Sequence, residues 1–162
     1  MVKRMKITGK RRTMWLAVVG LLVLFAQTSF ASRQLSLTYD EPIYTAIGYS
    51  DWITGDMNWH SVIGHPPLVN LLTAWPLLLG PARPDPTTIP GWGTEDSLGF
   101  SRALLSQLGT LDQVALVTRL PVMWLALLLA AVVYRWAQRT WGVASGLLAL
   151  GLFCFDLNIF AY

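Results

Sequence analysis

Apolar residues are concentrated in three long segments of this chain, separated by one long polar stretch and one short one. The first segment, residues 14–31, carries no charge and approaches the roughly 20 residues that a helix needs to cross a bilayer. The second, residues 114–134, contains one charged residue, Arg119, which lies near its start and can reach the interface. The third, residues 141–162, begins with small residues that let membrane helices approach closely. The pattern predicts an all-α integral membrane protein with three transmembrane helices.

Two further helices are expected within the long segment 32–113, between the first two spans. Residues 66–80 (PPLVNLLTAWPLLLG) are apolar but too few to cross a bilayer, so we expect an interfacial or re-entrant helix. The two prolines at its start suit the first turn of a helix, and Pro76 is expected to kink it. Residues 101–111 are weakly amphipathic and are a second candidate for a surface helix.

The positive charges orient these segments. Half of the 12 Lys and Arg residues lie in the tail 1–13, and Arg135 and Arg139 lie in the short connection 135–140. Because segments rich in Lys and Arg stay on the cytoplasmic side, we expect the tail and this turn inside and the loop 32–113 outside. The expected location is the inner membrane of a bacterium or the endoplasmic reticulum of a eukaryote.

Composition supports a lipid environment. The chain is 54% hydrophobic and 13% charged, whereas soluble domains carry about a quarter charged residues. The net charge of +3 comes from the basic tail, which is short and flanks a membrane segment, so nucleic-acid binding is not supported. A single cysteine, Cys154, excludes a disulfide-stapled secreted domain. A cleavable signal peptide is the alternative for the first segment, because Ser29-Phe30-Ala31 fits a cleavage site loosely.

The sharpest chemical candidate is the pair Asp40-Glu41, which is followed by Pro42 and lies just beyond the first span. Two adjacent acids at a membrane boundary are costly to place near apolar surface unless they have a partner or a task. A partly desolvated carboxylate there could accept a proton from a hydroxyl group. The alternative is an ordinary solvated charge pair in an interfacial turn.

Other candidates in the loop are less specific. His60 and His65 could form an oxygen and nitrogen metal site with Asp40 or Asp56, which leaves a divalent metal open, although the spacing is not diagnostic. The favoured alternative is that His65 caps or orients the interfacial helix. Trp59 and the other loop tryptophans are expected to anchor at the headgroup level, or alternatively to stack on a sugar or an isoprenoid chain. The chain has no P-loop, dinucleotide fingerprint, nucleophile elbow or zinc pattern, so a soluble nucleotide-dependent enzyme is not supported.

Taken in order, these features resemble the dolichyl-phosphate-mannose–protein mannosyltransferase family and related lipid-linked sugar transferases of the GT-C membrane fold. The likeness covers nearly all of residues 14–162. The motifs that carry it are Asp40-Glu41-Pro42, Gly48-Tyr49, Gly55-Asp56, His65-Pro66-Pro67-Leu68, Pro76-Leu77-Leu78-Leu79, Arg119-Leu120-Pro121-Val122 and Tyr134-Arg135-Trp136-Ala137.

The resemblance implies a membrane glycosyltransferase that moves a sugar, in mannosyltransferase fashion, from a polyprenyl-phosphate donor to a hydroxyl group of a protein, glycan or lipid acceptor. It implies that Asp40 is the catalytic base and Glu41 the neighbouring acid. The expected substrate-binding residues are Tyr44, which stands where many relatives have His, together with Asp56, Trp59 and His65.

The same resemblance makes the chain the N-terminal three-helix part of a larger GT-C bundle, a fragment that is inactive alone. The alternative from another class is a non-enzymatic membrane protein. It would be a fragment of a transporter or an assembly factor, whose outer loop binds a partner.

Overall fold

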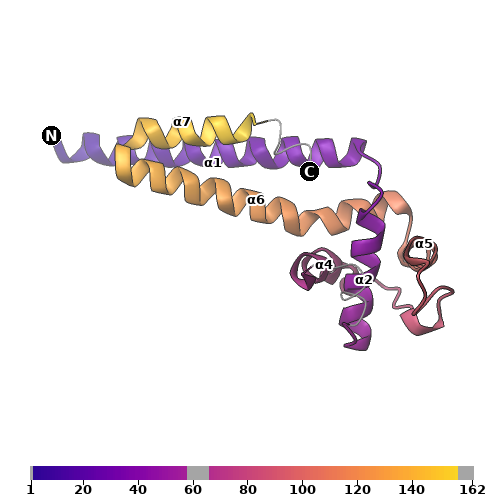
Figure 1. Cartoon of the computed structure of the whole chain (residues 1–162). Helices are drawn as coiled ribbons and strands as arrows, with labels where there is room; N and C mark the ends of the chain where they lie inside the picture. Colours follow the sequence, from indigo (N-terminus) through magenta and orange to yellow (C-terminus); the bar gives the residue numbers. More distant parts are fainter. Residues whose placement is uncertain (1, 58–65, 157–162) are drawn as a thin grey trace. The chain divides into compact units, whose positions relative to one another are not determined.

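The computed structural model describes residues 2–57 and 66–156, and every regular element among them is a helix (Figure 1). This confirms the all-α class for the described residues. The chain divides into two compact units, the first made of Met1–Ala31 with Met123–Tyr162 and the second of Ser32–Val122. The elements are α1 (Val2–Gln34), α2 (Glu41–Thr54), α4 (Pro67–Ala74), the 3-10 helices η1 (Trp75–Leu79) and η2 (Pro86–Thr88), α5 (Ser97–Leu108), α6 (Leu111–Trp141) and α7 (Val143–Cys154).

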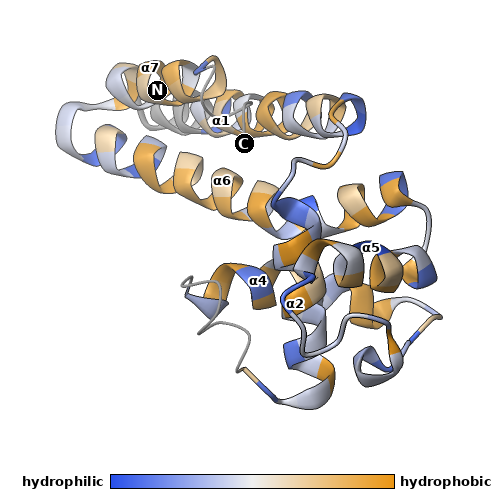
Figure 2. Ribbon diagram, turned by 45° about the vertical axis from the view of Figure 1, so that its right-hand side comes forward, coloured by the Kyte–Doolittle hydropathy of each residue, from blue (hydrophilic) through white to orange (hydrophobic). Residues whose placement is uncertain are grey.

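In the first unit, stretches of α1, α6 and α7 lie side by side (Figures 1 and 2). Small side chains set how closely they pack. A Cβ atom placed on Gly20 of α1 would lie 2.8 Å from the Leu150 side chain of α7. Beside this contact, the Cys154 thiol donates a hydrogen bond of 3.4 Å to the Gly20 carbonyl. The buried centre of the unit consists of Ala17, Leu24, Ala130, Leu150 and Cys154.

Two helices of the described chain are long and apolar enough to cross a membrane, over Arg11–Gln34 and Leu111–Trp141. They contain the predicted spans 14–31 and 114–134 and extend beyond both of them. Only 11% of the apolar window in the first and 22% in the second is buried inside the protein, so few of the residues in these windows are fully covered by other parts of the described chain. The third predicted span, 141–162, includes the apolar α7, which has 12 residues, and then residues 157–162, which lie outside the described part.

The connection between the second and third apolar segments differs from the sequence expectation. Residues 135–140 were expected to form a turn, but α6 continues through them to Trp141. Most of these residues are good helix formers, and the Gln138 amide donates to the Tyr134 hydroxyl one turn back, at 3.0 Å. The chain reverses at Gly142, whose φ of +96° is a conformation that other residues rarely adopt.

The second unit is built around α2, against which α4 and α5 pack (Figure 2). A close approach of α4 is possible because α2 has glycine at position 48. A Cβ there would lie 2.0 Å from the Asn70 carbonyl oxygen of α4. The Tyr49 hydroxyl donates to the Pro84 carbonyl at 3.2 Å and ties α2 to the following connector. The buried core consists of Ala46, Tyr49, Ala74, Leu77, Ile89, Phe100, Leu104, Leu105 and Val114.

The apolar stretch 66–80 forms α4 followed directly by η1, both within the expected range. The α-helix gives way to the tighter 3-10 helix at Trp75, just before Pro76. This change of helix type fits the expected effect of a proline, which has no N–H for the α-helical hydrogen bond. At the far end, the Arg83 guanidinium donates to the Leu78 carbonyl at 2.9 Å.

Candidate functional site

Asp40 and Glu41 stand at the start of α2 and have different surroundings. Asp40 precedes the first helical residue, is exposed, and makes no capping hydrogen bond with its side chain. Glu41 opens the helix, and Pro42 follows in the first turn, where a residue without an N–H is tolerated. The two acids therefore lie in a helix start, and only Glu41 is partly buried.

The Glu41 carboxylate is held by a two-pronged ion pair with Arg119 of α6. The Arg119 Nε donates to Oε1 at 2.9 Å, and its Nη2 donates to Oε2 at 2.7 Å. The backbone N–H of Thr38 donates to the same Oε2 at 2.8 Å. Paired charge-assisted hydrogen bonds of this kind fix orientation as well as adding energy. Both carboxylate oxygens of Glu41 are therefore engaged.

Arg119 also binds the last turn of α1 and the two residues that follow the helix. Its Nη1 donates to the carbonyls of Ser32 and Leu35, at 2.9 and 2.8 Å, and its Nη2 donates to that of Ser36, at 3.0 Å. The last carbonyls of a helix have no partner within the helix, and positive charge is favourable beside them. One guanidinium thus fastens the end of α1 to the beginning of α2, and fixes the turn that carries Asp40.

The pKa of Glu41 reflects this arrangement. Burial alone raises the pKa of the carboxyl group, but the hydrogen bonds and charge of Arg119 and the Thr38 amide outweigh it, so the pKa falls below its ordinary value of 4.5. A carboxylate with a lowered pKa is a weak proton acceptor. The geometry therefore favours a positioning role for Glu41 over a role as base.

A pocket of about 260 Å³ lies beside the turn, within the second unit. Asp40 does not line it, but Tyr39 before it and Pro42 two residues after it do, so the turn that holds Asp40 borders the pocket. The wall is largely apolar, with Arg102 of α5 and Asp112 of α6 as its charged members. The lining residues are Ser36, Leu37, Thr38, Tyr39, Pro42, Leu98, Arg102, Leu105, Leu111 and Asp112.

The residues predicted to bind substrate are not all brought together. Tyr44 is one turn from Asp40, and its backbone N–H donates to the Asp40 carbonyl at 3.1 Å. Asp56 follows the other end of α2, so roughly 20 Å of helix separates it from Asp40. A metal site that uses both acids is therefore excluded. Trp59 and His65, like His60, lie outside the described residues.

Within residues 2–57 and 66–156, no group of three His, Cys, Asp or Glu side chains is placed to hold a metal ion. The described loop tryptophans differ from one another. Trp75 is exposed, whereas Trp92 is partly buried with its ring 5.7 Å from that of Phe100. Asp156, an acid that follows the apolar α7, is exposed.

Sequence reasoning missed the partner of Glu41. The only signal was an arginine inside an apolar segment, which was expected to reach the interface, and the 78 positions between the two residues hid their contact. Comparison with protein families, with curated proteins and with solved structures found no match to this chain.

Proposed function

We propose that this chain belongs to an integral membrane glycosyltransferase that transfers a sugar from a polyprenyl-phosphate donor to a hydroxyl group of an acceptor. In this proposal the two long apolar helices cross the membrane. The apolar segment that begins near Trp141 is a third span of a GT-C bundle. The ordered motifs of the sequence support this proposal. In it, the turn before α2, which holds Asp40 and Glu41, contains the catalytic groups.

The observation that carries the proposal is the difference between the two adjacent acids. Glu41 is fully engaged with Arg119 and Thr38, while Asp40 is exposed beside residues that line a pocket. The exposed Asp40 does not have the partial desolvation expected from the sequence, but its carboxylate is the one of the two that an acceptor hydroxyl group can reach. Asp40 is therefore the proposed base, and Glu41 and Arg119 position it.

The reaction follows from these roles. The acceptor hydroxyl oxygen attacks the anomeric carbon of the donor sugar, and the bond between that carbon and the phosphate oxygen breaks. The polyprenyl phosphate leaves with the electron pair, and Asp40 takes the hydroxyl proton. The phosphate leaving group is already activated, so the reaction consumes no nucleotide.

The test uses the complete product of the gene, reconstituted with synthetic polyprenyl-phosphate mannose and with host membranes as the acceptor source. Asp40→Asn keeps the size of the side chain but removes the base, so we expect release of polyprenyl phosphate to fall about 100-fold or more. Glu95→Gln is the matched control, because Glu95 is exposed and lies in the turn before α5.

Unaltered release by Asp40→Asn would remove Asp40 as the base. No release by the unchanged protein with mannose or other hexose donors would favour the non-enzymatic alternative.

A further inference from the structure

The segment formed by α4 and η1 has a buried side and, opposite to it, an exposed apolar side. One side packs inside the second unit through Asn70, Ala74 and Leu77, which are all buried. The other side is exposed, and its residues are Leu68 (72% exposed), Val69 (57%), Trp75 (42%) and Leu79 (75%). We call these four residues the outer face of α4–η1.

An exposed apolar surface of this kind indicates contact with another molecule or with lipid. Large apolar side chains scattered singly on a surface are normal, but a contiguous group marks a site of contact. Residues 66–80 contain no charged side chain, so nothing within the segment interrupts the apolar face. The buried side already accounts for the packing on α2, so the outer face has no packing role among the described residues of the second unit.

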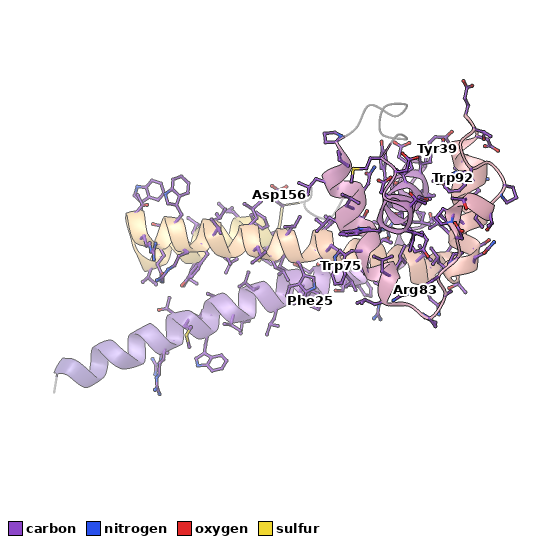
Figure 3. The ribbon with its side chains drawn as sticks, turned by 90° about the horizontal axis from the view of Figure 1, so that it is seen from below. Phe25, Tyr39, Trp75, Arg83, Trp92 and Asp156 are labelled. Carbon is purple, nitrogen blue, oxygen red and sulfur yellow. The ribbon has the colours of Figure 1, made fainter. Side chains whose placement is uncertain are left out.

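Two neighbouring side chains give this surface the character of a membrane interface. The Trp52 indole N–H donates to the Leu71 carbonyl at 2.9 Å, which leaves a half-exposed aromatic ring beside α4 with its polar group satisfied. Arg83, held against the Leu78 carbonyl, places a positive charge at the end of η1 (Figure 3). Tryptophan rings are enriched at the headgroup level, and arginine there can meet lipid phosphates.

We propose that the outer face of α4–η1 docks on the lipid bilayer, with its side chains in the boundary between headgroups and acyl chains. The chain itself favours lipid over a protein partner. The second unit begins in the last turn of one helix that can cross a membrane, and it ends within another. In the proposed protein both of its ends are thereby fixed to the membrane, so the bilayer is present at high effective concentration.

Docking would hold the turn with Asp40 at a constant depth near the membrane, where a lipid-linked donor reaches it. This inference rests on the proposed membrane insertion, and its test separates the two. The full chain with Cys154→Ser receives one new cysteine, which is labelled with the fluorophore NBD and reconstituted in phosphatidylcholine and phosphatidylglycerol vesicles. The three labelled positions are Leu79 on the outer face, Thr94 in an exposed turn of the same unit, and the outward-facing Leu128 within α6.

At Leu79 we expect quenching by lipids that carry a spin label near the headgroup, and iodide quenching roughly threefold weaker than at Thr94. At Leu128 we expect quenching by a label in the middle of the acyl chain. Iodide quenching at Leu79 equal to that at Thr94 would overturn the docking. So would protection of Leu79 from both quenchers, because protein would then cover the face. Absence of lipid quenching at Leu128 would overturn the insertion on which the docking depends.

Discussion

At the scale of single residues, the structure separates two acids that are adjacent in the sequence. Asp40 and Glu41 have the same charge and lie one residue apart, so the residues alone do not assign their roles. The difference comes from Arg119, which binds Glu41 and leaves Asp40 exposed. Asp40 is therefore proposed as the base because its neighbour Glu41 is already bound by Arg119.

We predict that Glu41→Gln destabilises the second unit by about 1–2 kcal/mol. The change removes the charge that Arg119 pairs with, and leaves a guanidinium that is 15% exposed without its anion. The Glu41 side chain is 32% exposed, which places the cost below that of a fully buried pair. Denaturant unfolding in detergent, followed by tryptophan fluorescence, measures it, with Glu95→Gln as the control.

The loss of stability caused by Glu41→Gln should depend on pH. Because the pKa of Glu41 is lowered in the folded protein, the stabilisation is present above the unfolded value near 4.5 and is lost as the pH falls through the folded value. The stability difference between the unchanged protein and Glu41→Gln should be full at about pH 7 and should shrink progressively as the pH falls below 4.5. A difference that stays constant over this range would contradict the ion pair as its cause.

At the scale of elements, α2 and α4 depend on a glycine at their contact. We predict that Gly48→Ala destabilises the second unit by about 2 kcal/mol or more, because the new Cβ would lie 2.0 Å from the backbone oxygen of Asn70. Unfolding of the purified variant, measured as for Glu41→Gln, checks this.

The matched control is Gly151→Ala in α7, a helical glycine whose added Cβ meets nothing within 4 Å. It should be neutral or stabilising by up to about 1 kcal/mol. Equal losses of stability in both variants would show that the packing of α4 on α2 is not the cause of the destabilisation by Gly48→Ala.

Some elements could be predicted and others could not, for physical reasons. The segment 66–80 was recognisable because it is apolar throughout, and α5 overlaps the predicted surface helix 101–111. No helix was predicted at α2, since nine of its 14 residues are buried and no polar face gives it a helical period. The ion pair of Glu41 with Arg119 was beyond prediction because only the folded chain brings α6 to the start of α2.

At the scale of the whole molecule, the sequence predicts which parts of the chain lie on each side of a membrane. The two helices of sufficient length are present, and the proposal that both cross the bilayer rests on them. The basic residues of the tail and of the end of α6 should then lie on one side, and the second unit on the other. This arrangement is open to a direct chemical test.

We predict that cysteines at Thr94 and Thr140, in a Cys154→Ser background, react with a membrane-impermeant maleimide from opposite sides of sealed membranes. Both residues are exposed, Thr94 in the turn before α5 and Thr140 in the last turn of α6 near Arg139. The N-terminal tail and Arg139 should stay on the cytoplasmic side, because transfer of arginine through the hydrocarbon core is costly. Thr140→Cys should therefore react only after the reagent is given access to the cytoplasmic side. Thr94→Cys should react without that access. Reaction of both from the same side would mean that α6 does not cross, and the turn at Asp40 would then lose the membrane setting that the transfer reaction requires.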